Sequence, residues 1–132
     1  MSAAAALQKA IFLALSNDAV LTGLIGSDGV RDHLQARMDR PCVFIATIES
    51  RDASTASEPG EEHLVMLEVR TGEGGNLAVQ AIAARVRALL DDADLDLDGF
   101  VLVSLFHRRT RTGREARAKG HVAAMVFRAV TE

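Results

Sequence analysis

Residues 63–90 read HLVMLEVRTGEGGNLAVQAIAARVRALL, and this stretch changes from one hydrophobic period to another. Its first nine residues alternate between two sides, as expected for a β-strand, and one side carries Val65, Leu67 and Val69. A glycine-rich break follows at residues 72–75, and Asn76 is placed to cap a helix. The apolar residues of that helix share one stripe: Val79, Ile82, Val86, Leu89 and Leu90. The stretch therefore predicts a strand, a turn and an amphipathic helix in succession.

Three further strands are predicted around this stretch. Residues 42–48 follow Pro41 as a run rich in β-branched side chains, and residues 100–106 and 121–130 form the other two. Residues 3–15 predict a first helix, and a short second helix ends at Gly26. Residues 27–40 predict a loop with at most a turn or a short strand near Val30. This order predicts an α+β fold, a four-stranded, mostly antiparallel sheet with helices packed on one face.

The length of 132 residues fits a single domain that spans residues 1–132. A domain of this size buries enough surface to fold without disulfides or a structural metal. Cys42 is the one cysteine of the chain, which indicates a reducing compartment, so we expect synthesis in the cytoplasm. No stretch approaches the ~20 apolar residues of a membrane span, so we expect a soluble protein with no membrane partner.

The formal net charge of −3 hides two clusters of opposite charge. Residues 108–119 contain six basic residues and one acidic residue, which leaves 9 basic and 17 acidic residues elsewhere, five of them aspartates within residues 91–98. The two clusters could meet between neighbouring copies of the chain. The candidate subunit interface consists of Arg108, Arg109, Arg111, Arg114, Arg117, Asp94, Asp96 and Asp98.

Other interpretations of the basic segment stay open. It could be a hairpin loop or the extended ends of two strands, and its side chains could be solvated or could contact phosphates. The chain contains no Tyr and no Trp, which disfavours a base-stacking platform for single-stranded nucleic acid.

Apolar residues also occupy the second side of the predicted strands. They are Phe44, Ala46, Ile48, Leu64, Met66, Leu102, Phe106 and Val126. Helices on a single side of the sheet cannot cover them, and monomers rarely expose large apolar patches to water. We therefore expect a neighbouring subunit over this side, with covering loops or a different assignment of the two sides as the alternative.

Residues 50–62 read SRDASTASEPGEE and contain no apolar side chain large enough to anchor a core. They predict a long exposed loop between two antiparallel strands. A loop of this length in a compact domain is usually functional or disordered, so we treat it as a candidate assembly loop. Its candidate contact residues are Arg51, Asp52, Ser54, Thr55, Glu58 and Glu61.

Catalytic residue types occur without the setting that catalysis needs. Cys42, His33 and Asp32 have the residue types of a thiol triad, but Cys42 begins an apolar run and is expected in the core. The other histidines lie at strand ends without metal-ligand spacing and are expected to be solvated or paired between strands: they are His63, His107 and His121. We expect no enzyme.

Two motifs resemble ion or phosphate sites only in part. Residues 94–99 resemble the opening of a calcium-binding loop, but Leu105 stands where that loop needs a bidentate glutamate. Residues 72–75 precede a helix without the lysine of a phosphate-binding loop. We therefore expect no bound metal and no cofactor.

Four stretches, in this order, resemble the tail-terminator (tail-completion) family of long-tailed phages and bacterial gene transfer agents. They are residues 6–26 (ALQKAIFLALSNDAVLTGLIG), 40–55 (RPCVFIATIESRDAST), 61–75 (EEHLVMLEVRTGEGG) with the helix that follows, and 97–106 (LDGFVLVSLF). None is a catalytic signature, so their order and spacing carry the resemblance. The chain departs from the family at Cys42, where a tyrosine is often found, and near Val69, where an aromatic residue is common.

The resemblance implies a small α+β subunit that forms a homo-oligomeric ring, commonly a hexamer, at the neck of a phage or gene transfer agent particle. Such a ring caps the tail tube, ends its polymerisation and joins it to the head connector. The implied partners are further copies of the chain, the tail tube protein and a head-connector or stopper protein, with DNA passing through the ring without sequence-specific binding. The alternative is a small binding or regulatory module that contacts nucleic acid through residues 108–119.

Overall fold

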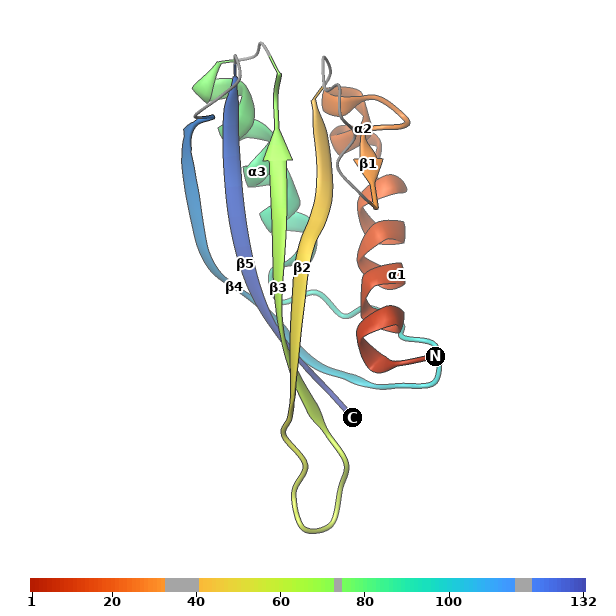
Figure 1. Cartoon of the computed structure of the whole chain (residues 1–132). Helices are drawn as coiled ribbons and strands as arrows, with labels where there is room; N and C mark the ends of the chain where they lie inside the picture. The colour runs from red at the N-terminus through yellow and green to blue at the C-terminus, as the bar shows by residue number, and fades with distance from the viewer. Residues whose placement is uncertain (33–40, 73–74, 116–119) are drawn as a thin grey trace.

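The computed structural model describes residues 1–32, 41–72, 75–115 and 120–132, and its helices and strands lie within these ranges. In chain order they are α1 (Ala3–Ser16), α2 (Ala19–Ile25), β1 (Val30–Arg31), β2 (Cys42–Asp52), β3 (Glu61–Arg70), α3 (Asn76–Leu90), β4 (Leu102–Arg114) and β5 (His121–Thr131). The strands form one twisted sheet with the helices on one side of it (Figure 1).

The sheet has five strands in the order β1-β2-β3-β5-β4. β1 runs parallel to β2, and the other neighbouring strands are antiparallel. The α+β class and the mostly antiparallel sheet are confirmed, but the predicted number of four strands is wrong. The additional strand, β1, has two residues and lies where a turn or a short strand was expected. Two residues are too few to show an alternating period, so the sequence pattern could not separate this strand from a loop.

Capping side chains set the starts of the first two helices. Ser2 accepts a hydrogen bond from a backbone amide at the start of α1, and Asp18 accepts one at the start of α2. α2 ends at Gly26, whose φ of 90° favours glycine, so the predicted end of this helix is confirmed. Among the described residues, no single helix is long and apolar enough to cross a membrane, and the bent pair of α1 and α2 passes such a test by length and composition alone.

The start of α3 differs from the prediction by one residue. Its N-cap is Gly75, which offers no side-chain hydrogen bond, and Asn76 is the first helical residue.

α3 is fixed to the start of α2 through Arg85, whose guanidinium donates hydrogen bonds of 2.8 and 2.6 Å to the Asp18 carboxylate. These bonds are the main reason that the pKa of Asp18 is lowered to about 2.

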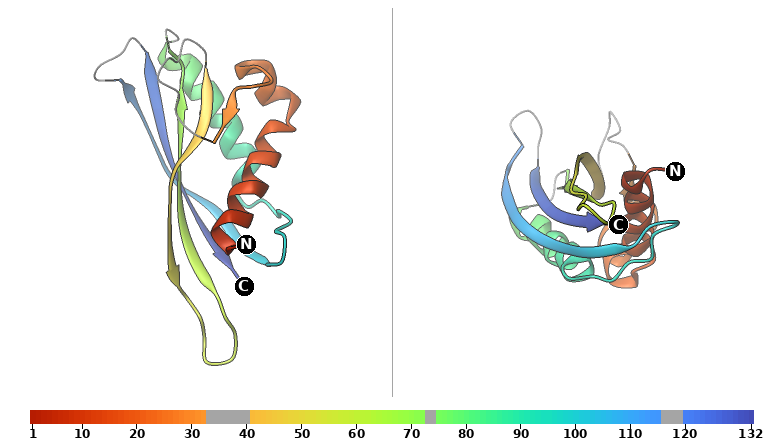
Figure 2. Two further views of the ribbon diagram at one scale, coloured as in Figure 1. Left: turned by 45° about the vertical axis from the view of Figure 1, so that its right-hand side comes forward. Right: turned by 90° about the horizontal axis from the view of Figure 1, so that it is seen from below.

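The core lies between the helices and one face of the sheet, which we call the helix face. β3 and β5 supply fully buried residues to it: Val65, Leu67, Val69, Met125 and Phe127. The helices supply Leu7, Ile11, Leu15, Leu21, Val79, Val86 and Leu90. The opposite face, which we call the outer face, has none of these helices over it in either view of Figure 2. The predicted alternation of β3 and the placement of helices on one face are therefore confirmed.

Bulges in β2 and β4 change which side chains reach each face. The register shifts at Ala46 in β2, and at Val103 and Arg108 in β4, leaving one residue unpaired each time. Because of these shifts, Ile48 and Leu102 lie on the helix face and pack against the core. Their expected place on the second side of the strands was wrong. The residues that do lie on the outer face are Phe44, Leu64, Met66, Phe106 and Val126.

The hairpin between β2 and β3 projects past both chain termini (Figure 1). Pairing continues to its end, where Asp52 lies opposite Glu61, and residues 53–60 form the tip. The predicted loop of residues 50–62 is therefore too long, because Arg51, Asp52 and Glu61 belong to strands. Its strand residues are polar on both faces, and without alternation they gave no strand signal. We call residues 49–62 the arm.

Candidate assembly surfaces

The basic segment extends β4 at the edge of the sheet. Arg108, Arg109, Arg111 and Arg114 lie in this strand and are exposed, whereas Arg117 lies outside the described residues. The register places Arg109 and Arg111 on the outer face and Arg114 on the helix face. None of the four forms an ion pair with a described residue. Of the two conformations considered for the segment, the extended strand is the one found up to residue 114.

The acidic residues lie on the other side of the molecule. After α3 the chain runs beneath α1 before β4 begins (Figure 1), and Asp94, Asp96 and Asp98 are exposed along this path. Leu95 and Leu97 between them pack against the core. Asp96 and Asp98 also border a hollow against α1. One chain therefore presents its acidic loop and its basic strand in different directions, and the structure does not bring the two clusters together within one copy.

The outer edge of β4 is covered over only part of its length. The amide of Asp92 donates a 2.8 Å hydrogen bond to the carbonyl oxygen of Leu105, and the amide of His107 donates a 2.9 Å hydrogen bond to Asp91 Oδ1. Asp92 adopts a φ of 57° at this turn. These contacts occupy the edge of β4 before the bulge at Arg108, and the described residues provide no comparable cover for residues 109–114.

The outer face has an ion-paired end at the arm. Glu62 accepts a hydrogen bond of 2.7 Å from Arg128 and forms a 2.8 Å ion pair with Arg51, so it joins β2, β3 and β5. The hydrogen bond from Arg128, followed by that from Arg51, lowers the pKa of Glu62 below its usual range. The carboxylate therefore stays charged in the folded protein down to lower pH than in an unfolded chain.

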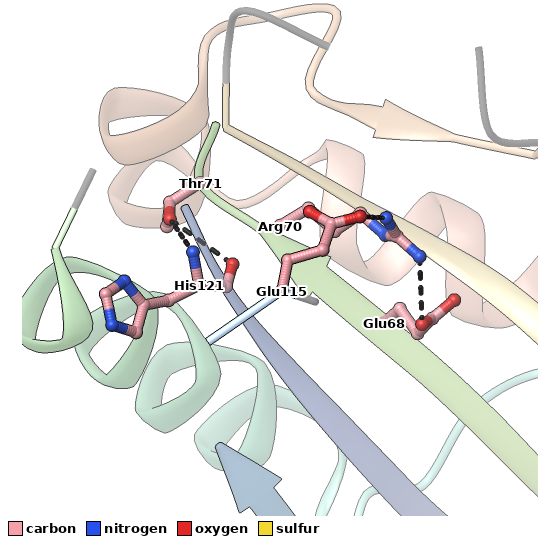
Figure 3. Close-up of polar contacts among 5 residues, drawn as sticks. All are labelled: Glu68, Arg70, Thr71, Glu115 and His121. Carbon is pink, nitrogen blue, oxygen red and sulfur yellow. Dashed lines mark hydrogen bonds and ion pairs between the residues drawn. The ribbon is translucent and has the colours of Figure 1, made fainter. Parts of the chain in front are cut away.

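A second charged group lies at the other end of the outer face. Arg70 forms ion pairs with Glu68 and with Glu115, and Figure 3 shows its guanidinium between the two carboxylates. The same guanidinium lies 5.8 Å from the centre of the Phe44 ring. Thr71, next in the chain, exchanges hydrogen bonds with the backbone of His121. These contacts tie the ends of β3, β4 and β5 together.

Between the two charged groups the outer face carries an apolar region, which Arg109 and Arg111 of β4 border. Leu64 and Phe106 are 38% and 45% exposed, and Met66 and Val126 are half-buried beside them. No described element covers this region. The expectation that the helices leave apolar residues of the second face uncovered is met for these four residues, and what covers them in an assembly stays a prediction.

The arm is fixed at its base by a buried histidine. His63 Nδ1 lies 2.6 Å from Ser50 Oγ, and His63 Nε2 lies 2.9 Å from Thr131 Oγ1. Burial is the main cause of the lowered pKa of His63, so the ring is neutral near pH 7. Of the two expected alternatives, pairing between strands is the one found for this histidine, because Ser50 is its partner on β2 and Thr131 lies on β5. Its complete burial was not expected. The alternation of β3 could have shown it, because His63 shares the side of Val65 and Leu67.

The tip of the arm holds its own shape through local hydrogen bonds. The Ala53 amide donates to the Gly60 carbonyl over 2.9 Å, and the Thr55 amide donates to the Glu58 carbonyl over 2.9 Å. Ser54 Oγ donates a 2.6 Å hydrogen bond to Asp52 Oδ1. The side chains of the candidate assembly loop are therefore displayed on a hairpin rather than on an irregular loop.

The remaining candidate groups have these positions. Cys42 is buried, and burial raises the pKa of its thiol, which opposes the thiolate that nucleophilic chemistry needs. Asp32 is exposed, and His33 lies outside the described residues. Within the described ranges, no group of three or more His, Cys, Asp or Glu is arranged to hold a metal ion.

Comparisons with known proteins add two matches to this geometry. A family model described as tail completion protein gp17 matches residues 9–132. A chain in the solved virion of a native gene transfer agent particle matches with 32% sequence identity and a TM-score of 0.90, over 99% of this chain and 98% of that chain. No match was found among proteins with curated descriptions.

Proposed function

The chain belongs to the tail completion protein gp17 family, and we propose that it forms a ring that caps the tail tube of a phage-like particle. Family membership and the match to the gene transfer agent virion make it a structural protein of a phage-type tail. In the proposal, the ring is a hexamer that ends polymerisation of the tube at the neck. It also joins the tube to the head connector or stopper protein.

One observation carries the ring proposal: each copy has an acidic surface and a basic surface that face different ways. Such a chain associates head to tail, with the acidic loop of one copy against the basic strand of the next. The proposed contact pairs Asp94, Asp96 and Asp98 with Arg108, Arg109, Arg111, Arg114 and Arg117. A contact between two different surfaces repeats from copy to copy. The copies close into a ring when the rotation angle between neighbours is a whole-number fraction of a full turn. Exposed charge pairs contribute only ~0–1 kcal/mol each, so they select the register while apolar contacts supply most of the association energy.

The other partners follow from the place of such a ring in a particle. The chain is made in the bacterial cytoplasm and then incorporated at the neck, and DNA passes through the ring without sequence-specific binding. The arm, which reaches beyond the body, is the proposed contact with the tube or the connector. Its candidate residues are Arg51, Asp52, Ser54, Thr55, Glu58 and Glu61. The ring acts by shape and contact, without catalysis.

A second function is favoured by a specific observation, the four exposed arginines on β4 that form no ion pair with a described residue. In this reading they bind phosphates, and the chain is a nucleic-acid-binding module. Reversing Arg108, Arg109 and Arg111 to glutamate separates the two functions. The ring proposal expects loss of assembly by light scattering and native mass spectrometry, with partial recovery when Asp94, Asp96 and Asp98 are also changed to lysine.

Duplex DNA binding is followed by fluorescence anisotropy across salt concentrations in the same variants. The nucleic-acid module would be established instead by salt-sensitive DNA binding that the arginine change abolishes. The aspartate change would then not restore binding, and assembly would be unaltered. A parent protein that stays monomeric at all concentrations, alone and with tail tubes, would reject the ring.

A further inference from the structure

We propose that the open edge of β4, residues 109–114, receives β2 of the arm from a second copy, so that the sheet continues from chain to chain. This inference rests on the proposed ring and names the backbone contact that holds it. It assigns Arg109 and Arg111, on the outer face, to β2 of the neighbouring copy rather than to its aspartates. The sheet ends at β4 on one side and, beyond the two residues of β1, at β2 on the other.

The first observation is the division of the β4 edge at Arg108. Before the bulge, Asp91 and Asp92 occupy the backbone groups of Leu105 and His107. After the bulge, residues 109–114 form a regular run of six that pairs with β5 on one side only among the described residues. An open edge of this kind is a template for another strand, and proteins normally cover it.

The second observation is a matching edge on β2. β1 pairs only with Val43 and Phe44, so the rest of β2 has no strand on this side in the described part of the chain. Beyond the bulge at Ala46, residues 47–52 form a regular run of six. The two open segments therefore have the same length.

Strand direction allows the two segments to pair. Three antiparallel pairings separate β2 from β4, so the two strands run in opposite directions within one chain. When a ring repeats the chain in one orientation, β2 of a second copy is antiparallel to β4 of the first. Antiparallel ladders are the more stable kind of strand pairing.

Charge selects this pairing over the alternatives. The arm carries five acidic residues and one basic residue, for a net charge of −4, whereas residues 108–114 carry four arginines and no acid. Glu49 lies on the outer face of β2, and Arg109 and Arg111 lie on the outer face of β4. In a continuous sheet, residues on the same face are neighbours, so Glu49 of one copy lies beside these arginines of the next. With Glu49 opposite Arg111, Arg51 lies opposite Arg109, and Glu62 of the same copy already pairs with Arg51. Pairing β4 with a second β4 would place arginines against arginines without any acidic residue.

The pairing also fixes how the strands stand in the ring. Within one chain, Arg109 lies level with Thr47, through Val126 and Met66. Arg111 is level with Phe44 in the same way, through Ala124 and Glu68. For Glu49 of the second copy to lie beside Arg111, that copy must be displaced along the strands by four residue steps, about 13 Å. Strands tilted against the ring axis by about 35–45°, as in closed barrels, provide such a displacement from copy to copy.

Disulfide cross-linking tests the contact directly. Glu49→Cys and Arg111→Cys are combined in a Cys42→Ala background, with Arg109→Cys as the alternative partner. Within one chain β2 and β4 are separated by two strands, about 14 Å, which a disulfide cannot span. We expect oxidation to give covalent oligomers on a non-reducing gel. The matched control combines Glu49→Cys with Thr110→Cys, whose side chain lies on the helix face, and should cross-link at least tenfold less.

A charge exchange gives the second measurement. Glu49→Arg should weaken self-association on the order of tenfold, and adding Arg111→Glu should restore it, whereas Arg87→Glu on the exposed side of α3 should restore nothing. Circular dichroism establishes that each variant is folded. Rings that form without any of the Glu49 cross-links overturn the β2–β4 contact and leave the ring proposal standing. Absence of oligomers in the parent protein rejects both.

Discussion

On β3, neighbouring residues meet opposite surroundings: His63, Val65 and Leu67 on the helix face are fully buried, while Leu64 on the outer face is 38% exposed. The helix face is continuous and apolar from α1 to α3. The outer face has charged groups at both ends and an apolar region between them. The difference teaches that burial against the helices accounts for the fold, whereas the outer face is organised by pairs of side chains and remains available for contact.

The largest effect on stability is expected from comparing two phenylalanines that lie on opposite faces of the sheet. Phe127→Ala empties a fully buried site on the helix face and should lower the free energy of unfolding by ~3–5 kcal/mol. Phe106→Ala on the outer face should cost less than about 1 kcal/mol. Urea denaturation followed by circular dichroism measures both. Equal losses would show that the outer face carries as much of the folding energy as the core.

Acid titration should distinguish His63 on the helix face from its neighbour Glu62 on the outer face, because the two residues lose their contributions to stability at different pH. The pKa of His63 lies below 6.5, so its contribution to stability is complete above about pH 6.5 and is lost as the pH falls from there through the lowered pKa. The pKa of Glu62 lies below 4.5, so its contribution is lost only at more acidic pH. The unfolding free energy of the parent, His63→Gln and Glu62→Gln should be measured from about pH 8 to 3.

His63→Gln should reduce the step nearer neutrality, to which His107 also contributes because burial lowers its pKa as well. Glu62→Gln should reduce the more acidic step, to which Asp18 and Asp52 also contribute. Each substitution serves as the control for the other, because the two residues are neighbours on opposite faces. A parent protein whose stability does not change between about pH 7 and 5 would contradict the buried position of His63.

The smallest effect on stability is expected at the tip of the arm, beyond the helices. Replacing residues 54–59 by Asn-Gly keeps the closing hydrogen bond between Ala53 and Gly60 and shortens the loop. Loop length enters stability only weakly, so the unfolding free energy should change by no more than about 1 kcal/mol. Assembly onto tail tubes should be impaired, as seen by electron microscopy of tube lengths. Tubes of normal, uniform length would show that the tip takes no part.

The helix face was predictable because burial leaves a periodic trace in the sequence. Val65, Leu67 and Val69 alternate, and the stripe of α3 repeats at the helical spacing, so the strand, the helix and their order were confirmed. The start of α3 was placed one residue late. Asn76 was chosen as the cap by residue type, but the extended backbone that precedes the helix ends at Gly75, so Gly75 is the N-cap.

The outer face and the arm were less predictable because contacts between strands leave no period. Glu62 is held by Arg51 and Arg128 from two other strands, and a single segment shows none of this pairing. The bulges at Ala46 and Arg108 likewise depend on the partner strand. The charge clusters could be read from composition, but their separation onto different sides of the molecule could not, since it depends on the path of the chain between α3 and β4.

The same bulges determine where the chain can change in length. Removing Arg108 would leave His107 and Arg109 opposite Phe127 and Val126, which are already adjacent partners, so each remaining side chain would keep its face. Removing Thr110 would instead shift Arg111 opposite Met125 and turn its guanidinium toward the helices. Loss of a single codon is therefore tolerable at the unpaired positions Ala46, Val103 and Arg108, and damaging at their paired neighbours. Variants that differ in length by one residue should carry the difference at these three places.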